Sequence, residues 1–502
     1  MTTTYDLVGI GIGPFNLGLA ALSDPLPDVD AVFLDQADGF SWHPGMMLEG
    51  ATIQVPFLAD LVTMADPTSP FSFLAFLKAT GRLYPFYIRE SFFPLRSEYD
   101  QYCRWVADRL GTLRWGRRVT SVTRETTPDG DVWAVTAVTA DGVEKYCAKH
   151  VVLGVGTTPR VPQALAGLLG PGDGAGTGPV VHTSDYLPHR DALVASGAVT
   201  VVGSGQSAAE VYRDLLEGID DGYRVDWVTR SPRFFPMEYT KLTLEMTSPE
   251  YTDHYHALPQ VLRDRLGREQ RNLYKGISGD LVDDIYETLY RKSALGRQVP
   301  TTLLTDTEVV AARRDPEGGY VLRLRHAQLA EAGGEAEVEH RTNALVVATG
   351  YGSSVPAFLD PVADLLDLDD GGRFVVARDY TVDRGRRLHV VNAEEHTHGV
   401  TAPDLGFGAW RNSVILASVT GREPYPIERR VAFQQFGLPD GGAAPGSPRS
   451  IPQRSKETSW GEGGGAAPGS PRSIPQRSKE TSWGEGGGGH LAQSAVLAEV
   501  AE

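Results

Sequence analysis

Two glycine-rich turns constrain the fold of this chain more than any other feature. The first occupies residues 9–13, after the strand-like run at 5–8, and the second occupies residues 203–207, after the apolar run at 199–202. Each is expected to join a strand to a helix, where glycines let the backbone approach a pyrophosphate and the helix N-terminus supplies N–H donors. The chain is therefore predicted to be an α/β protein with two Rossmann-like dinucleotide-binding domains.

The residue that ends the next strand indicates which dinucleotide each turn binds. The strand expected at 31–34 ends at Asp35, and an acid in this place suits a ribose with a free 2′-hydroxyl, as in FAD or NAD. The strand expected at 225–229 ends at Arg230, which favours a 2′-phosphate. The first turn is thus predicted to bind FAD and the second NADPH, an arrangement that suits electron transfer between two cofactors.

Composition argues against several classes of partner. The 502 residues carry a formal net charge of −17, whereas a nucleic-acid-binding protein needs clustered Lys and Arg. The hydrophobic content of 41% is enough for two or three domains. No apolar run reaches the ~18 residues of a membrane-spanning helix. We expect a small-molecule substrate, no nucleic acid and no membrane.

The N-terminus and the cysteines indicate a compartment. The first predicted strand begins within about five residues of the start, which leaves no room for a signal peptide. The sequence holds two cysteines, Cys103 and Cys147, and no CxxC pair. These features favour a cytoplasmic protein and exclude a flavin disulfide reductase, which needs a redox dithiol.

The pattern of strands and helices divides the chain into discontinuous domains. Amphipathic patterning near residues 280–286 indicates a helical segment that interrupts the second domain, after which the chain returns to the first. The predicted boundaries are 1–190 and 356–438 for the FAD domain, 191–235 and 299–355 for the NADPH domain, and 236–298 for a smaller helical substrate-binding segment.

The end of the chain differs in kind from the rest. Residues 442–464 and 465–487 are identical, and Gly, Pro and Ser dominate both copies. Such a segment has too little apolar surface to offset the entropy lost on ordering. Residues 439–502 are therefore predicted to be a disordered tail, to which we assign no function.

Further motifs lie at residues 9–17, 41–46, 54, 203–207, 348–351 and 396–399. Together they resemble those of one known family, the microbial N-hydroxylating flavin monooxygenases. The resemblance covers about residues 5 to 437 in unbroken order. It implies hydroxylation of the side-chain amine of ornithine or lysine, or of a terminal amine of putrescine or cadaverine, for hydroxamate siderophore synthesis. In this family NADPH reduces FAD, and O₂ then forms a C4a-hydroperoxyflavin that the amine attacks.

The turns and the resemblance together suggest which residues hold the cofactors. The FAD residues are Gly9, Gly11, Gly13, Pro14, Asn16, Asp35, Trp42, His43, Gln54, Gly399 and Leu405. The NADPH residues are Gly203, Gly205, Gln206, Ser207, Arg230, Asn272, Thr349 and Tyr351. No residue is assigned as a general acid or base. His396 and His398 lack partners at metal-ligand spacing, so no metal is expected.

Three departures from the ornithine hydroxylases bear on the substrate. Those enzymes hold the amino-acid head with a Lys, an Asn and a nearby Ser, where this chain has Ala59, Leu244 and Gly406. A buried carboxylate without its partner costs several kcal/mol. The substitutions therefore favour a diamine, putrescine or cadaverine, and one methylene separates these two by only about 1 kcal/mol.

The second amine of a diamine needs an acceptor. Glu238 and Glu245 are candidates, and Asn272 matches a family asparagine that contacts both NADP⁺ and the substrate. Lys241 could instead replace the missing lysine, which keeps L-lysine and L-ornithine open as substrates. A non-catalytic flavin-binding redox sensor is the alternative from another class. The resemblance also implies a homo-oligomer, either a dimer or a tetramer.

Overall fold

The computed structural model describes residues 4–128, 130–172 and 176–438. The predicted disorder of residues 439–502, with the duplicated segment, lies outside the described residues. Two separate sheets, each containing one of the glycine-rich turns, organise the rest. The predicted α/β class is therefore confirmed.

The first sheet is built around the first turn. Its strand order is β3-β2-β1-β6-β5-β4, with β17 beside β6. β1 runs parallel to β2 and β6, while β4, β5 and β6 form an antiparallel meander. Every residue of β2 is buried, as in a parallel strand covered on both faces. The strands are β1 (Thr4–Ile10), β2 (Ala31–Leu34), β3 (Leu113–Arg114), β4 (Arg118–Thr127), β5 (Gly130–Thr139), β6 (Gly142–Leu153) and β17 (Leu388–Val390).

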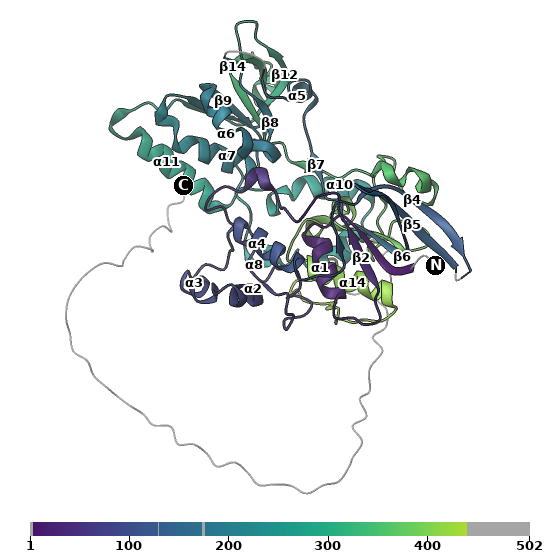
Figure 1. Ribbon diagram of the computed structural model, residues 1–502. Coiled ribbons are helices and arrows are strands. Elements are labelled where there is room, and N and C mark those ends of the chain that lie inside the picture. Colours follow the sequence, from purple (N-terminus) through teal and green to yellow (C-terminus); the bar gives the residue numbers. More distant parts are fainter. Residues whose placement is uncertain (1–3, 129, 173–175, 439–502) are drawn as a thin grey trace, which may run out of the picture. The chain divides into compact units, whose positions relative to one another are not determined.

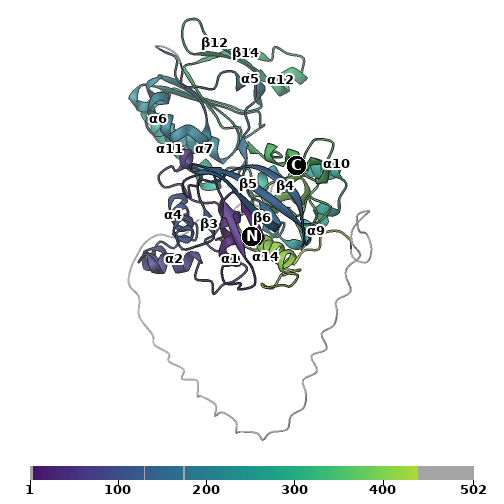
Figure 2. The same ribbon diagram turned by 45° about the vertical axis from the view of Figure 1, so that its right-hand side comes forward.

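Helices on the first sheet come from both ends of the described chain. α1 and α14 lie side by side in both ribbon views, although most of the sequence separates them (Figures 1 and 2). Their inner faces join the same apolar core as β2. The helices of this half are α1 (Pro14–Ser23), α2 (Phe73–Ala79), α3 (Leu83–Ile88), α4 (Arg96–Ala107), α13 (Glu395–His398) and α14 (Gly408–Thr420).

The second sheet consists of five parallel strands in the order β11-β10-β9-β15-β8. A three-stranded antiparallel sheet follows β11 in sequence and packs through β14 next to β9. The strands are β8 (Val180–His182), β9 (Ala198–Val202), β10 (Arg224–Val228), β11 (Thr301–Leu304), β12 (Thr307–Arg314), β13 (Tyr320–His326), β14 (Glu337–Thr342) and β15 (Ala344–Val347). Its helices include α5 (Gln163–Ala166), α6 (Tyr186–Ala195), α7 (Gln206–Glu217) and α12 (Ala327–Glu331).

The structure moves one predicted domain boundary. Residues 1–190 were expected to belong to the first domain, but β8 pairs in parallel with β15 of the second sheet. The chain leaves the first sheet after β6, and β7 (Thr158–Pro159) pairs with β16 (Tyr351–Gly352) where the chain returns. The boundary therefore lies near this short two-stranded ladder, well before residue 190.

The helical segment expected at 236–298 divides between the two halves. α9 and α10 pack on α13 of the first half, around Tyr251, Tyr255 and Val400. α11 instead lies along α7 of the second sheet, and both ribbon views show this pair (Figures 1 and 2). The single substrate-binding unit is therefore not observed. The helices are α8 (Lys241–Leu244), α9 (Pro249–Ala257), α10 (Gln260–Glu269) and α11 (Gly279–Ser293).

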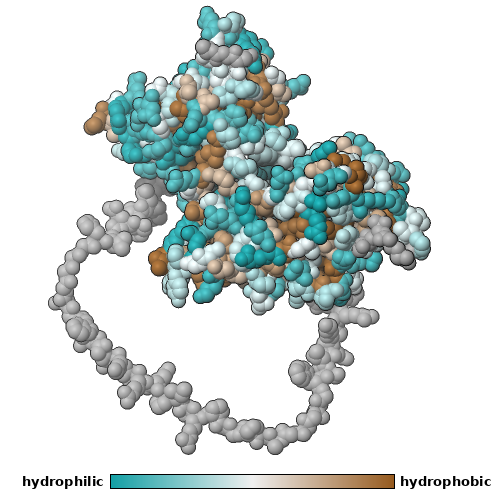
Figure 3. Space-filling view, viewed as in Figure 1, coloured by the Kyte–Doolittle hydropathy of each residue, from teal (hydrophilic) through white to brown (hydrophobic). Residues whose placement is uncertain are grey.

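The surface is polar with separate apolar patches. Hydrophilic residues dominate the face in Figure 3, and hydrophobic residues interrupt them locally. Exposed apolar side chains occur on α3 and in the loop after it. Within α3, Tyr87 is 76% and Ile88 is 72% exposed. Within the described ranges, the model contains no helix that is both long and apolar enough to cross a membrane.

Candidate active site

Buried side chains hold the first glycine-rich turn closed. Gly11 has a φ of +87°, and a Cβ there would overlap the Gly154 carbonyl oxygen, so the position requires glycine. The Asp35 carboxylate accepts a hydrogen bond of 2.7 Å from the Ile12 N–H. Asn16 is fully buried and donates from Nδ2 to the Gly11 carbonyl oxygen at 2.8 Å. Asn16 therefore supports the turn from behind, and its predicted contact with a pyrophosphate stays a prediction.

The N-terminus of α1 is open to a ligand. Gly13 is the N-cap, no side chain caps the helix, and a Cβ at Gly13 would meet no atom within 4 Å. Pro14 opens the helix, as its fixed φ allows. Gly9 differs, because the Phe33 ring occupies the space of a Cβ and the glycine serves strand packing. The free N–H groups and positive dipole end of α1 fit an anionic pyrophosphate.

The second turn has the same backbone design. A Cβ at Gly203 would overlap the Ala348 carbonyl oxygen, and Gly205 is an N-cap of α7 without a side-chain cap. Ser207 lies in the first turn of α7. Arg230 follows β10, is exposed, and makes no hydrogen bond or ion pair with the described residues. Its guanidinium is available for a phosphate at the strand end.

Gln206 is occupied by protein partners. Its Oε1 accepts from the Ser278 N–H at 2.8 Å, and its Nε2 donates to Glu210 at 2.9 Å. Glu210 also pairs with Arg96 of α4 at 2.6 Å. Gln206 thus fastens α7 to the start of α11 and to an ion pair with the first half. Both amide atoms of Gln206 have protein partners, and its predicted contact with NADPH stays a prediction.

Candidate residues from the two cofactor sets meet between the sheets. The His43 ring centroid lies 6.0 Å from that of Tyr351 and 5.1 Å from that of Trp42. His43 has a φ of 49°, an uncommon backbone conformation for a residue other than glycine. Thr349 donates to the Arg160 carbonyl oxygen at the β7–β16 crossing. The flavin-side and nicotinamide-side candidates therefore share one location.

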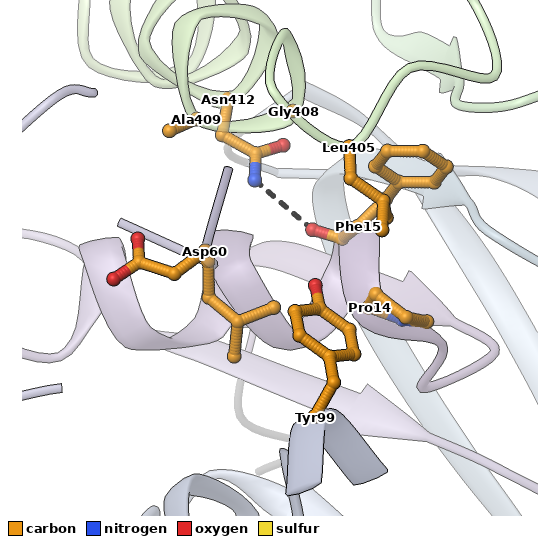
Figure 4. A pocket seen from close by; sticks show the side chains of 9 residues that line it. Pro14, Phe15, Asp60, Tyr99, Leu405, Gly408, Ala409 and Asn412 are labelled. Atoms are coloured by element: carbon orange, nitrogen blue, oxygen red, sulfur yellow. Dashed lines mark hydrogen bonds between the residues drawn. The ribbon is translucent and has the colours of Figure 1, made fainter. Parts of the chain in front are cut away.

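Two flavin-side candidates, Gln54 and Leu405, have features that fit a ligand site. The Gln54 amide nitrogen is buried without a hydrogen-bond partner among the described residues, so a ligand acceptor there would satisfy it. Leu405 lines a small cavity of about 10 Å³ beside the start of α1, where Asn412 donates to the Phe15 carbonyl oxygen at 3.0 Å (Figure 4). The cavity residues are Pro14, Phe15, Asp60, Leu61, Tyr99, Leu405, Gly408, Ala409 and Asn412.

Gly399 serves a packing role between the first half and the helical segment. Its φ is +70°, and a Cβ there would lie 3.2 Å from the Tyr255 ring of α9. The position requires glycine for backbone conformation and for this close approach. The predicted role of Gly399 toward FAD stays a prediction.

The positions that suggested a diamine lie close together. Ala59 is only 6% exposed, and a Cβ at Gly406 would lie 3.5 Å from the Ala59 Cβ. Leu244 ends α8 and is 47% exposed, and its carbonyl oxygen accepts from the Thr247 N–H at 3.0 Å. The Thr247 hydroxyl in turn contacts Asp404 at 3.5 Å. The fold thus brings three positions from distant parts of the sequence to one place.

The two acids expected to bind the second amine have protein partners. Glu238 accepts from the Asn272 amide at 3.2 Å, which joins two of the predicted substrate residues on the exposed surface. Glu245 accepts from the backbone N–H groups of Phe433 and Gln434 at 2.8 and 2.9 Å. Glu245 therefore anchors the chain after α14, and its predicted contact with the substrate stays a prediction.

The family follows from comparison with known proteins. The model for L-lysine 6-monooxygenase/L-ornithine 5-monooxygenase matches residues 3–353. The chain belongs to this family. It is 46% identical over 437 residues to the putrescine N-hydroxylase of Shewanella oneidensis, covering 86% of this chain and 84% of that protein. The predictions of an enzyme and of this monooxygenase family are confirmed.

Two solved structures share the fold of this monooxygenase. The cadaverine monooxygenase DfoA of the desferrioxamine pathway of Erwinia amylovora, bound to FAD, is 46% identical with a TM-score of 0.82, covering 88% of this chain and all (100%) of that chain. The ornithine N-hydroxylase of Kutzneria sp. 744, with reduced FAD, NADP⁺ and L-ornithine, is 28% identical with a TM-score of 0.73, covering 84% and 99%. These structures contain FAD and NADP⁺, so the predicted cofactors FAD and NADPH are confirmed.

Sequence reasoning missed one acid of this monooxygenase, Asp404. It comes directly before Leu405, but nothing in the local pattern separates it from an ordinary loop acid. In the structure it is half-buried, and its Oδ1 accepts from the Gly406 N–H at 2.6 Å. Burial raises the pKa of Asp404, although bonds from Gly406 and Phe407 oppose this. The carboxylate lies beside the positions that suggested the diamine.

Asp60, the residue after Ala59, has a structural role, in contrast to Asp404. Its carboxylate accepts four hydrogen bonds, from the N–H groups of Val62, Thr63 and Phe73 and from the Thr63 hydroxyl, at 2.6 to 2.9 Å. These bonds fix the loop that carries Ala59. Asp60 therefore has little capacity left for a ligand.

The described ranges contain no group of three or more His, Cys, Asp or Glu residues placed to hold a metal ion. His396 donates from Nε2 to the Phe374 carbonyl oxygen at 2.7 Å. His398 is fully buried and stacks on Tyr380. The two histidines thus have separate protein partners.

Proposed function

We propose that this monooxygenase uses FAD, NADPH and O₂ to hydroxylate one terminal amine of an aliphatic diamine, putrescine or cadaverine, in hydroxamate siderophore biosynthesis. The observation that carries the proposal is the close approach of buried Ala59 and Gly406. Neither residue has a side chain that could donate a hydrogen bond to an α-carboxylate. A buried carboxylate without a donor is strongly disfavoured. The likeness to a putrescine N-hydroxylase and to a cadaverine monooxygenase supports the same substrate class.

The flavin, reduced by NADPH, would supply the oxygen-transfer chemistry, and the protein supplies position and a dry site. Gly13 and the N-terminus of α1 would hold the FAD pyrophosphate, with Asp35 at the ribose. The unpartnered Gln54 amide would donate to the flavin. Gly205, Ser207 and the exposed Arg230 would hold NADPH, and the His43–Tyr351 contact lies where the two sets meet.

The reacting amine has to be neutral to act as a nucleophile. An alkylamine has a reference pKa near 10.4, so only ~0.1% is neutral at about pH 7.4. Apolar surroundings such as Ala59 and Leu405 disfavour the charged form and raise this fraction. No protein base is required by this account, because solvent accepts the proton before the amine reacts.

The test is amine-dependent product formation by the purified, FAD-loaded full chain. Putrescine, cadaverine, L-ornithine and L-lysine are each incubated with NADPH and O₂, and the N-hydroxylated product is measured by mass spectrometry. The proposal predicts product from one or both diamines and at most traces from the amino acids. Product mainly from L-lysine or L-ornithine would overturn the diamine assignment. Peroxide release without amine product would favour the redox-sensor alternative.

Other expectations stay predictions. The exposed apolar side chains on α3 support a homo-oligomer, and sedimentation of the full chain measures whether it is a dimer or a tetramer. Absence of nucleic-acid binding and a cytoplasmic location rest on composition. Putrescine and cadaverine differ by one methylene, so some reaction with both is expected.

A further inference from the structure

We infer that the Asp404 carboxylate binds the distal ammonium group of the substrate, the amine that is not hydroxylated, and so selects diamines over amino acids. This inference rests on the proposed function and adds the residue that determines specificity. It concerns binding alone, because Asp404 takes no part in oxygen transfer.

The first support is the position of the carboxylate. A Cβ at Gly406 would lie 3.0 Å from Asp404 Oδ1 and 3.5 Å from the Ala59 Cβ, so all three residues share one small space. From the other side, Thr247 reaches Asp404 Oδ2 at 3.5 Å from the turn that follows Leu244. Ala59, Gly406 and the turn after Leu244, the positions without a donor for an α-carboxylate, therefore border the Asp404 carboxylate.

The second support is unused hydrogen-bonding capacity. The Asp404 carboxylate accepts from the backbone N–H groups of Gly406 and Phe407 and, at the long distance of 3.5 Å, from the Thr247 hydroxyl, whereas its two oxygens have about four lone-pair sites. Other acids nearby are fully engaged. Asp60 accepts four hydrogen bonds, and Glu394 is paired with Arg411 at 2.5 Å in the core. Asp404 is thus the acid at this site with room for a donor.

The third support is the missing countercharge. Asp404 makes no ion pair with a Lys or Arg of the described residues, and the nearby Arg411 is committed to Glu394. A half-buried carboxylate without an ion-pair partner is costly, and burial raises the pKa of Asp404 even though the charge of Arg411 acts in the opposite direction. An ammonium group would remove the penalty. The α-carboxylate of L-ornithine or L-lysine at the same place would be repelled, so one residue provides both attraction and rejection.

The test compares two substrates and two variants of the FAD-loaded full chain. Putrescine and n-butylamine share length and a reacting amine, but n-butylamine lacks the second ammonium. Asp404→Asn keeps an Oδ1 acceptor for the Gly406 N–H while removing the charge. Asp283→Asn, on the exposed side of α11, is the matched control for loss of one negative charge. Kd from titration calorimetry, KM, kcat and bound flavin are measured for each.

For the wild type we expect putrescine to have a KM about 10- to 100-fold below that of n-butylamine, the range of a charge-assisted hydrogen bond. Asp404→Asn should raise the putrescine KM and Kd by a similar factor, with unchanged bound flavin and an unchanged KM for n-butylamine. Asp283→Asn should change neither. The putrescine KM of the wild type should also rise as the pH falls through the pKa of Asp404, because protonation removes the charge.

Three outcomes would overturn the inference. Equal KM values for putrescine and n-butylamine in the wild type would show that the distal ammonium is not bound, and this arm needs no variant. An unchanged putrescine KM in Asp404→Asn would place the ammonium elsewhere, for example at Glu238. Equal losses for both substrates would mean a structural role. In each case hydroxylated putrescine from the wild type leaves the proposed function standing, whereas no amine product from any substrate would refute that function itself.

Discussion

The two glycine-rich turns both join a strand to an uncapped helix N-terminus, but the side chains beside them form hydrogen bonds in different directions. In the first, Asp35 and buried Asn16 bond to the turn itself, so its shape is fixed from within. In the second, Gln206 bonds away from the turn, to Ser278 and Glu210, and Arg230 stands exposed without a partner among the described residues. A rigid turn suits a cofactor that stays bound, and an exposed arginine suits one that enters and leaves in each turnover.

The sharpest way to break this comparison is Gly13→Ala. A Cβ at Gly13 meets no atom within 4 Å, so the empty fold should tolerate it, whereas a pyrophosphate against the N-terminus of α1 would be displaced. We expect a normal thermal unfolding temperature but at least about a tenfold weaker FAD affinity, which is a loss of about 1.4 kcal/mol or more. Flavin absorbance after gel filtration measures it.

Gly111→Ala is the matched control for this variant. Its added Cβ also meets no atom within 4 Å, but Gly111 lies in the turn before β3, away from both glycine-rich turns. It should retain full flavin. If Gly13→Ala retained flavin equally well, the first turn would not be the pyrophosphate site.

Arg230→Gln tests the second turn. Loss of a charged donor to the 2′-phosphate should raise the KM for NADPH about 10- to 100-fold and leave that for NADH unchanged, because NADH has no such phosphate. Steady-state NAD(P)H oxidation measures both values. Arg233→Ala is the contrast, since its guanidinium already stacks 4.5 Å above the Phe235 ring. A loss of NADPH preference in Arg233→Ala but not in Arg230→Gln would contradict the assignment.

The smallest expected effect is on the internal support of the first turn. Asp35→Ala removes the acceptor of the buried Ile12 N–H and should lower the free energy of unfolding by about 1–3 kcal/mol. Asp35→Asn keeps an acceptor and should lose less. Urea unfolding of the two variants with FAD removed separates this structural role from any contact with the ribose. Equal stability of Asp35→Ala and the wild type would show that the turn does not depend on this bond.

The elements next to the turns were predictable from sequence because their signals are local. The strand expected at 31–34 is β2, and the helices expected after the two turns are α1 and α7. β8 was missed because three residues carry no reliable periodicity, and its partner β15 is far along the chain. The division of the helical segment was missed because amphipathic patterning shows that a face is buried but not which core receives it.

The candidate site shows the same limit. The substitutions at Ala59, Leu244 and Gly406 were visible in the sequence, but their convergence on Asp404 depends on tertiary contacts, such as that with Thr247 across 157 residues. The sequence indicated Glu245 as an acceptor for the second amine, but it did not indicate that the backbone N–H of Phe433 would bond to this carboxylate. Residue type suggested the chemistry, and packing decided which acid remains available.

The measurement that tests the central claim most directly is a crystal structure of the full chain with FAD, NADP⁺ and putrescine. We predict the FAD pyrophosphate at Gly13 and the N-terminus of α1, and the NADP⁺ 2′-phosphate on the Arg230 guanidinium. A flavin at the second turn, or a 2′-phosphate bound away from Arg230, would contradict the division of labour between the two turns.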